Sequence, residues 1–144
     1  METIESLLEQ GNIIRVRPQG YSMYPFIRPG RDQVVLKKVS PRALKRGDVV
    51  LYQRAGGMLV LHRIWKRKKD GFYLVGDNQI AVEGPVNAEQ IKGQMIVFCR
   101  NGRYISAKNP YYFLLTRLWL ILRPFRQKIS AFVSFLKKHP LSIC

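Results

Sequence analysis

One serine of this 144-residue chain lies in a segment whose backbone freedom is restricted. Ser22 comes two residues after Gly20 and three residues before Pro25. Glycine permits close approach of the backbone to another group, and a proline holds the residue before it extended. A serine in this setting can present its hydroxyl and neighbouring amides to a carbonyl group. The competing interpretation of so short a pattern is a structural turn.

A serine hydroxyl is a weak nucleophile at neutral pH and needs a base within hydrogen-bond distance. His62 lies in the apolar run 59–64, with the sequence LVLHRI, and imidazole has a suitable pKa. The second histidine, His139, lies in a Lys-Lys-His-Pro tail and is predicted to be a solvated cation. His62 is therefore the candidate base, and a structural histidine on the polar face of a strand is its alternative interpretation.

Two carboxylates follow in segment 76–86, with the sequence GDNQIAVEGPV. A carboxylate beside an imidazole fixes its tautomer and stabilises the imidazolium, so either Asp77 or Glu83 can complete a triad. Gly-Asp-Asn is also common turn chemistry. Such a set would catalyse acyl transfer, with the Ser22 amide as one oxyanion donor. It needs no cofactor and no metal.

Short apolar runs separated by turn residues predict a mainly antiparallel β domain over residues 1–108, preceded by a short helix within 2–10. Turn chemistry at 55–57, 69–71 and 101–102 predicts three hairpins. Segment 76–86 is predicted to be a loop after a strand. The predicted strands are 13–17, 33–39, 48–54, 58–66, 71–75, 94–100 and 103–107.

Residues 109–144 have a different composition and predict a separate helical appendage. Residues 111–122 are apolar nearly all round, but they fall short of the roughly 20 residues that span a bilayer. After Pro124, the segment to residue 138 is amphipathic with a basic side. The alternative interpretation of residues 111–122 is a covering helix that packs on the β domain.

The formal net charge of +16 points to an anionic partner. The charge is +5 over 1–61, +5 over 62–108 and +6 over 109–144, and the last segment contains no acidic residue. We therefore expect residues 111–138 to contact an anionic membrane surface. A basic cluster, Arg63 with Lys66 to Lys69, raises nucleic-acid binding as a further alternative. No recognition motif accompanies this cluster, so a nucleic-acid partner is not expected.

The predicted location is cytoplasmic and peripheral to the membrane. The N-terminal segment lacks the basic and apolar regions of a secretory signal. Two cysteines, Cys99 and Cys144, are too few for a disulfide framework and have no metal-ligand spacing, which favours a reducing compartment.

In chain order, GYSMYP (20–25), LHRI (61–64) and GDN (76–78) resemble the catalytic boxes of the signal peptidase I-like serine peptidases, the S24/S26 group. The likeness covers about residues 3–98 and includes RGDVVL (46–51) and EQIKG (89–93). It implies a signal peptidase/LexA-like antiparallel β fold and an endopeptidase that cleaves a precursor or leader peptide. With a histidine as its candidate base, the chain resembles the endoplasmic-reticulum, archaeal and sporulation branch of this group. The bacterial leader-peptidase and LexA-like branch uses lysine as the base.

By this resemblance Ser22 is the nucleophile and His62 the general base. The position of the acid falls on Glu83, where the family usually has Asp, and Asp77 belongs to the Gly-Asp box. The family's membrane enzymes carry an N-terminal transmembrane anchor, where this chain has a short acidic segment. A membrane-surface module without catalysis is the alternative function.

Strand-rich peptidases commonly bind substrate as an added strand. The substrate-binding residues predicted on this basis are Gly20, Tyr21, Met23 and Leu61.

Overall fold

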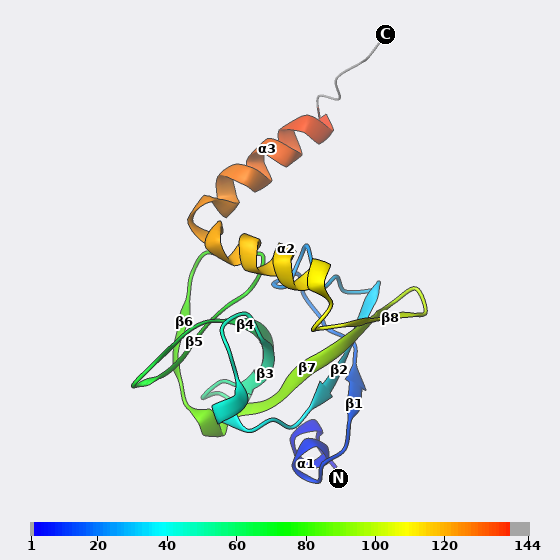
Figure 1. Ribbon diagram of the computed structural model, residues 1–144, viewed down its shortest axis with the longest axis vertical. Coiled ribbons are helices and arrows are strands. Elements are labelled where there is room, and N and C mark those ends of the chain that lie inside the picture. The colour runs from blue at the N-terminus through cyan, green and yellow to red at the C-terminus, as the bar shows by residue number, and fades with distance from the viewer. Residues whose placement is uncertain (1, 139–144) are drawn as a thin grey trace.

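The computed structural model describes residues 2–138 and shows a curled antiparallel sheet with helices at both ends of the chain (Figure 1). His139 and Cys144 lie outside the described residues. The helices are α1 (Ile4–Glu9), α2 (Pro110–Ile121) and α3 (Arg126–Lys138), with 3₁₀ turns η1 (Pro41–Ala43), η2 (Ala88–Gln90) and η3 (Arg123–Phe125). The strands are β1 (Ile14–Val16), β2 (Asp32–Lys37), β3 (Val49–Gln53), β4 (Leu59–Lys68), β5 (Gly71–Val75), β6 (Glu83–Val86), β7 (Ile91–Arg100) and β8 (Arg103–Ser106).

The strands form one sheet in the order β1-β2-β7-β3-β4-β5-β6, and β8 pairs with β7. All pairs are antiparallel, which confirms the predicted mainly antiparallel β class. The three predicted hairpins are present as β3–β4, β4–β5 and β7–β8. At the last turn Asn101 has a φ of 52°, the positive value for which Asn-Gly is suited.

Strand β6 was not predicted, and the interpretation of 76–86 as a loop throughout is wrong. Gly84-Pro85 has the composition of a chain break, but β6 is an edge strand that pairs only with β5. Proline is tolerated there because an edge strand needs only half of its backbone donors. As a consequence Glu83 lies in the sheet, opposite Leu74, and not in a mobile connection.

Two apolar clusters fill the interior of the curled sheet. One joins α1, β2 and β7 around Leu8, Val34 and Phe98, all nearly inaccessible to solvent. The second lies between β3, β4 and β5 around Tyr52 and Leu74. Strands β3 and β4 therefore present side chains to a tightly packed interior, which holds those side chains in fixed positions.

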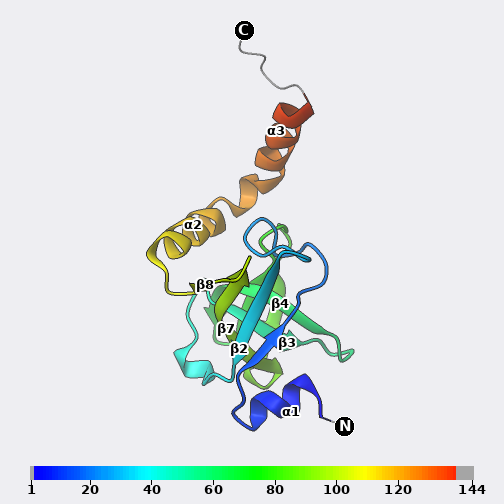
Figure 2. The same ribbon diagram turned by 90° about the vertical axis from the view of Figure 1, so that its right-hand side faces the viewer.

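Helix α2 lies across one end of the sheet and packs against it through Tyr112, Thr116 and Leu120, all buried. The covering-helix interpretation is thus confirmed for this face. The helix begins with Asn109, whose side-chain oxygen accepts from the amides of Tyr111 and Tyr112 at 3.0 and 3.2 Å. Beyond η3, α3 projects away from the sheet, while α1 lies at the opposite end (Figure 2).

Candidate active site

Ser22 and His62 line the same groove, which has a volume of about 420 Å³. The two residues are 40 positions apart in the sequence, and the antiparallel sheet brings their segments together. Gly20, Met23 and Leu61, three of the predicted substrate-binding residues, also line the groove. The groove continues to Ile4 of α1, Met58 and the first residues of β4.

Tyr21 is the predicted substrate-binding residue that is not among those lining the groove. Its side chain is 61% exposed to solvent. Met23 lines the groove but is only 3% exposed, so it forms part of the floor and of the interior cluster.

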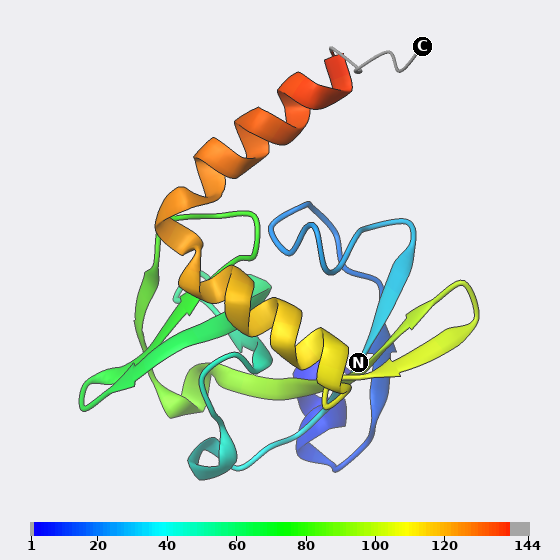
Figure 3. The ribbon, with the colours of Figure 1, turned by 45° about the horizontal axis from the view of Figure 1, so that its top comes forward.

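The backbone of Ser22 is held by loop 76–78. The amide of Asn78 donates to the Ser22 carbonyl oxygen at 2.8 Å, and a Cβ at Gly76 would lie 2.6 Å from that oxygen. Further along the same loop, Phe26 makes an edge-to-face contact with Trp119 of α2, with ring centroids 6.4 Å apart. Figure 3 shows the loop that contains Ser22 (blue) and loop 76–82 (green) at the end of the sheet from which α3 projects.

The amide of Ser22 donates no hydrogen bond to any other group within residues 2–138. An oxyanion hole requires such an unoccupied donor directed at the site where charge develops. The Ser22 amide is therefore available for that role.

His62 lies on β4 with its ring 3% exposed, and it forms a hydrogen-bond chain with two further residues. Its Nδ1 is 3.2 Å from the hydroxyl of Tyr52, and that hydroxyl donates to the Glu83 carboxylate. A phenol has one O–H donor, and here that donor makes its hydrogen bond to Glu83. The Tyr52 oxygen must therefore accept a hydrogen bond from Nδ1–H of His62. The chain therefore assigns the tautomer with an unprotonated Nε2, which is the form of a general base.

Glu83 reaches His62 through Tyr52 and also pairs with Arg54. The Arg54 Nε and Nη2 atoms lie 2.8 and 3.1 Å from the two Glu83 oxygens. Burial acts to raise the pKa of Glu83, but hydrogen bonds from Arg54 and Tyr52 outweigh it and hold the pKa below its usual value. Burial and Glu83 together raise the pKa of Tyr52, so both groups keep these protonation states at neutral pH.

Burial of the His62 ring lowers its pKa to about 4, although the charge of Glu83 acts in the opposite direction. A base must be neutral, so Ser22 acylation should stay constant as pH falls from 7 to about 5.5 and halve near pH 4. An unperturbed histidine would give this midpoint near pH 6.5. The measurement is the rate of labelling by a serine-directed acylating probe across this range, with circular dichroism in the same buffers. A midpoint at or above pH 6.5 would contradict the assignment.

Replacing Tyr52 with Phe should lower the acylation rate about 10- to 100-fold. The substitution leaves Nδ1–H without its acceptor and separates Glu83 from the ring, so the tautomer is no longer fixed. Tyr73→Phe is the matched control, because that hydroxyl bonds Asp70 at the β4–β5 turn, at 2.7 Å. Equal labelling rates in the two variants would show that the Tyr52 hydroxyl has no role in positioning His62.

Asp77 does not bond His62. Both of its carboxylate oxygens accept from Arg63, each at 2.8 Å, and both side chains are almost completely buried. Arg63 also donates to the hydroxyl of Tyr112 on α2, at 3.0 Å. Of the two predicted acids, the structure connects Glu83 to the imidazole and places Asp77 in a separate buried ion pair.

Tyr52 and Arg54 were not predicted as site residues. The register of the predicted β3–β4 hairpin contained the signal for Tyr52. Val50 pairs with His62 and Tyr52 with Val60, so Tyr52 and His62 are diagonal neighbours on one face. Arg54 has no such signal, because its partner Glu83 belongs to β6, the edge strand that no local sequence pattern predicts.

Side chains from the C-terminal helices bind the backbone of loop 76–80. The N–H groups involved donate to carbonyl oxygens of a segment that carries the predicted Gly-Asp box. This loop in turn bonds Ser22, so α2 and α3 support the site through it. Trp119 donates to the carbonyl oxygen of Asp77, and Arg123 donates to that of Ile80. Arg126 donates to the carbonyl oxygens of both Gly76 and Gln79.

The first half of β4 has an open edge on the groove. β4 pairs with β3 over residues 59–63, but β5 pairs with it only from Arg63 onward. In the part of the chain that the structure describes, no strand covers the second edge of residues 59–62. An extended peptide can pair with such an edge.

The basic cluster considered for nucleic acid loses one member, because Arg63 is buried against Asp77. The cations at Lys66, Arg67 and Lys68 lie over the rings of Trp65, Phe72 and Tyr73, respectively. Across residues 2–138, no three histidine, cysteine or acidic side chains gather in a way that would hold a metal ion.

Comparison of the chain with protein-family models, with curated proteins and with solved structures gives no match.

Proposed function

We propose that this protein is a serine endopeptidase of the signal peptidase I-like type, and that its β domain has the signal peptidase/LexA-like fold of the S24/S26 group. The observation that carries the proposal is the groove shared by Ser22 and His62, with the His62 ring bonded to Tyr52 and through it to Glu83. The sequence resemblance supports it, because residues of the GYSMYP and LHRI boxes line this groove and the amide of Asn78, in the GDN box, donates to the Ser22 carbonyl oxygen.

In the proposed reaction, His62 Nε2 takes the proton of the Ser22 hydroxyl as Oγ attacks a peptide carbonyl carbon. The Ser22 amide binds the oxyanion, and the imidazolium is stabilised by Glu83 through the Tyr52 hydroxyl. The imidazolium then gives its proton to the leaving amine, and an acyl-enzyme ester remains. A water molecule, deprotonated by His62, hydrolyses this ester and regenerates Ser22.

The proposed substrate is an extended segment of a precursor or leader peptide. It would pair with the open edge of residues 59–62 and lie between that edge and the loop containing Gly20. Backbone pairing of this kind gives affinity, and the side-chain pockets of the groove give specificity.

A peptide library tests this function. Full-length parent and Ser22→Ala chains are incubated with the library in the presence of phospholipid vesicles, and new termini are identified by mass spectrometry. New internal termini are expected with the parent and not with the variant. Absence of cleavage by the folded parent, or the same termini with both chains, would overturn the proposal.

The alternative of a membrane-surface module without catalysis makes a different prediction. Such a module would bind lipid and leave peptides intact in the same assay. The continuous chain from His62 to Glu83 favours the peptidase, because lipid binding has no need of a buried imidazole that lines the same groove as a serine.

A further inference from the structure

The C-terminal helices present a long apolar surface to solvent. On α2 the outward face consists of side chains that are 51% to 80% exposed, at the i, i+3, i+4, i+7 spacing of one helical stripe. We call this the outer face. Its residues are Tyr111, Leu114, Leu115, Leu118 and Ile121.

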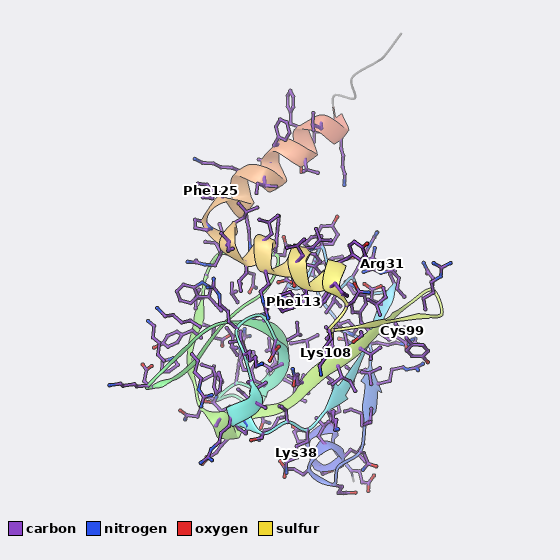
Figure 4. The ribbon with its side chains drawn as sticks, in the orientation of Figure 1. Arg31, Lys38, Cys99, Lys108, Phe113 and Phe125 are labelled. Carbon is purple, nitrogen blue, oxygen red and sulfur yellow. The ribbon has the colours of Figure 1, made fainter. Side chains whose placement is uncertain are left out.

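Helix α3 continues this surface away from the sheet. Phe125 precedes the helix, and Phe132, Val133 and Leu136 follow at helical spacing, all between 38% and 62% exposed. Figure 4 labels Phe113 on α2 and Phe125 at the turn, and shows α3 projecting away from the sheet. Soluble monomers rarely leave so many large apolar side chains together in water.

The charges on the same helices have a single sign. Residues 109–138 contain six basic residues and no acidic one. Arg123 and Arg126 bond loop 76–80, whereas Lys128, Lys137 and Lys138 are exposed on α3. Apolar side chains bordered by lysines are complementary to a bilayer with anionic headgroups. Each Lys or Arg near such a surface contributes about 1 kcal/mol of binding free energy.

We propose that the outer face of α2 and the apolar stripe of α3 dock on an anionic bilayer surface. Within residues 2–138, no helix is long and apolar enough to cross a membrane. Docking places the helices in the plane of the interface, where apolar side chains enter the acyl boundary and lysines contact headgroups. This proposal stands independently of the peptidase proposal, because it concerns lipid binding alone.

The geometry connects the docked helices to the groove. The inner face of α2 is already packed on the sheet, so insertion of the outer face requires no unfolding of the domain. Trp119 contacts Phe26, which follows Ser22 in the same loop. Docking therefore brings the Ser22 loop close to the bilayer.

Vesicle flotation with the full chain tests the proposal. We expect the parent to float at least about tenfold more with vesicles of phosphatidylcholine and phosphatidylserine than with phosphatidylcholine alone. Leu114→Ser, Leu115→Ser and Leu118→Ser combined should reduce flotation about tenfold or more, as should Lys128→Gln, Lys137→Gln and Lys138→Gln combined at low salt. All six positions are exposed, so the fold should persist, as circular dichroism would show.

The matched control replaces three exposed apolar side chains of the β domain, Ile13→Ser, Met58→Ser and Tyr104→Ser, which are 59% to 62% exposed. It should float like the parent. The proposal is overturned if the parent fails to float, if it floats equally with neutral vesicles, or if the leucine variant floats like the parent. A dimer in light scattering that the leucine variant abolishes, without flotation of the parent, would identify a second copy as the occupant and also overturn it.

Discussion

Replacing Ser22 with alanine is expected to lower peptide cleavage by about 10⁴-fold or more. In the proposed mechanism the Ser22 hydroxyl oxygen forms the acyl-enzyme, and among the side chains that the structure describes no other serine lines the groove. His62→Ala should have an effect of similar size, because without its base the hydroxyl keeps its proton at neutral pH. The double variant should be no slower than either single variant, since the two residues act as one unit.

Ser40→Ala is the matched control for this prediction. Ser40 is exposed, its side chain makes no capping hydrogen bond, and it does not line the groove. Cleavage should be unchanged in this chain. If Ser22→Ala retained activity within tenfold of the parent while folded, another nucleophile would be required and the proposed mechanism would be wrong.

The second large effect is on stability. Asp77→Asn is expected to lower the free energy of unfolding by about 3–5 kcal/mol, because it leaves the buried Arg63 guanidinium without a counter-charge. A small domain has only about 5–15 kcal/mol in total, so this variant should approach spontaneous unfolding. Loss of the pair would also disturb Tyr112, which links Arg63 to α2.

Urea denaturation measures this change, with Asp70→Asn as the control. Asp70 is exposed, and its carboxylate accepts from the Tyr73 hydroxyl, so its replacement should cost under about 1 kcal/mol. Equal stability of the Asp77 and Asp70 variants would refute a structural role for Asp77.

Glu83→Gln should lower cleavage with a small effect on stability, since its carboxylate is partly exposed.

The strands and hairpins could be predicted because their signals are local. Alternating apolar residues and Asn-Gly or Gly-Gly turns specify β3–β4 and β7–β8 without reference to the rest of the chain. Strand β6 could not be predicted, because Gly84-Pro85 is tolerated only at a sheet edge and the edge is a property of the whole sheet.

The site could be predicted in part, because some of its signals are local and others depend on the whole fold. Residue types and spacing make Ser22 and His62 candidates, and both line one groove. The choice between Asp77 and Glu83 depends on which arginine each carboxylate meets. Asp77 pairs with Arg63 and Glu83 with Arg54, and both pairs join residues that are distant in the sequence, so no local pattern assigns them. The sequence leaves open whether α2 packs on the β domain, because residues on its packed and exposed faces are both largely apolar.

Labelling with a serine-directed acylating probe, followed by mass-spectrometric mapping of the adduct, tests the Ser22–His62 pair most directly. The folded parent should carry one adduct, on Ser22 Oγ, and His62→Ala should be labelled at least about 100-fold more slowly. An adduct on a different serine, no adduct on the folded parent, or equal labelling of His62→Ala would contradict a catalytic serine activated by His62.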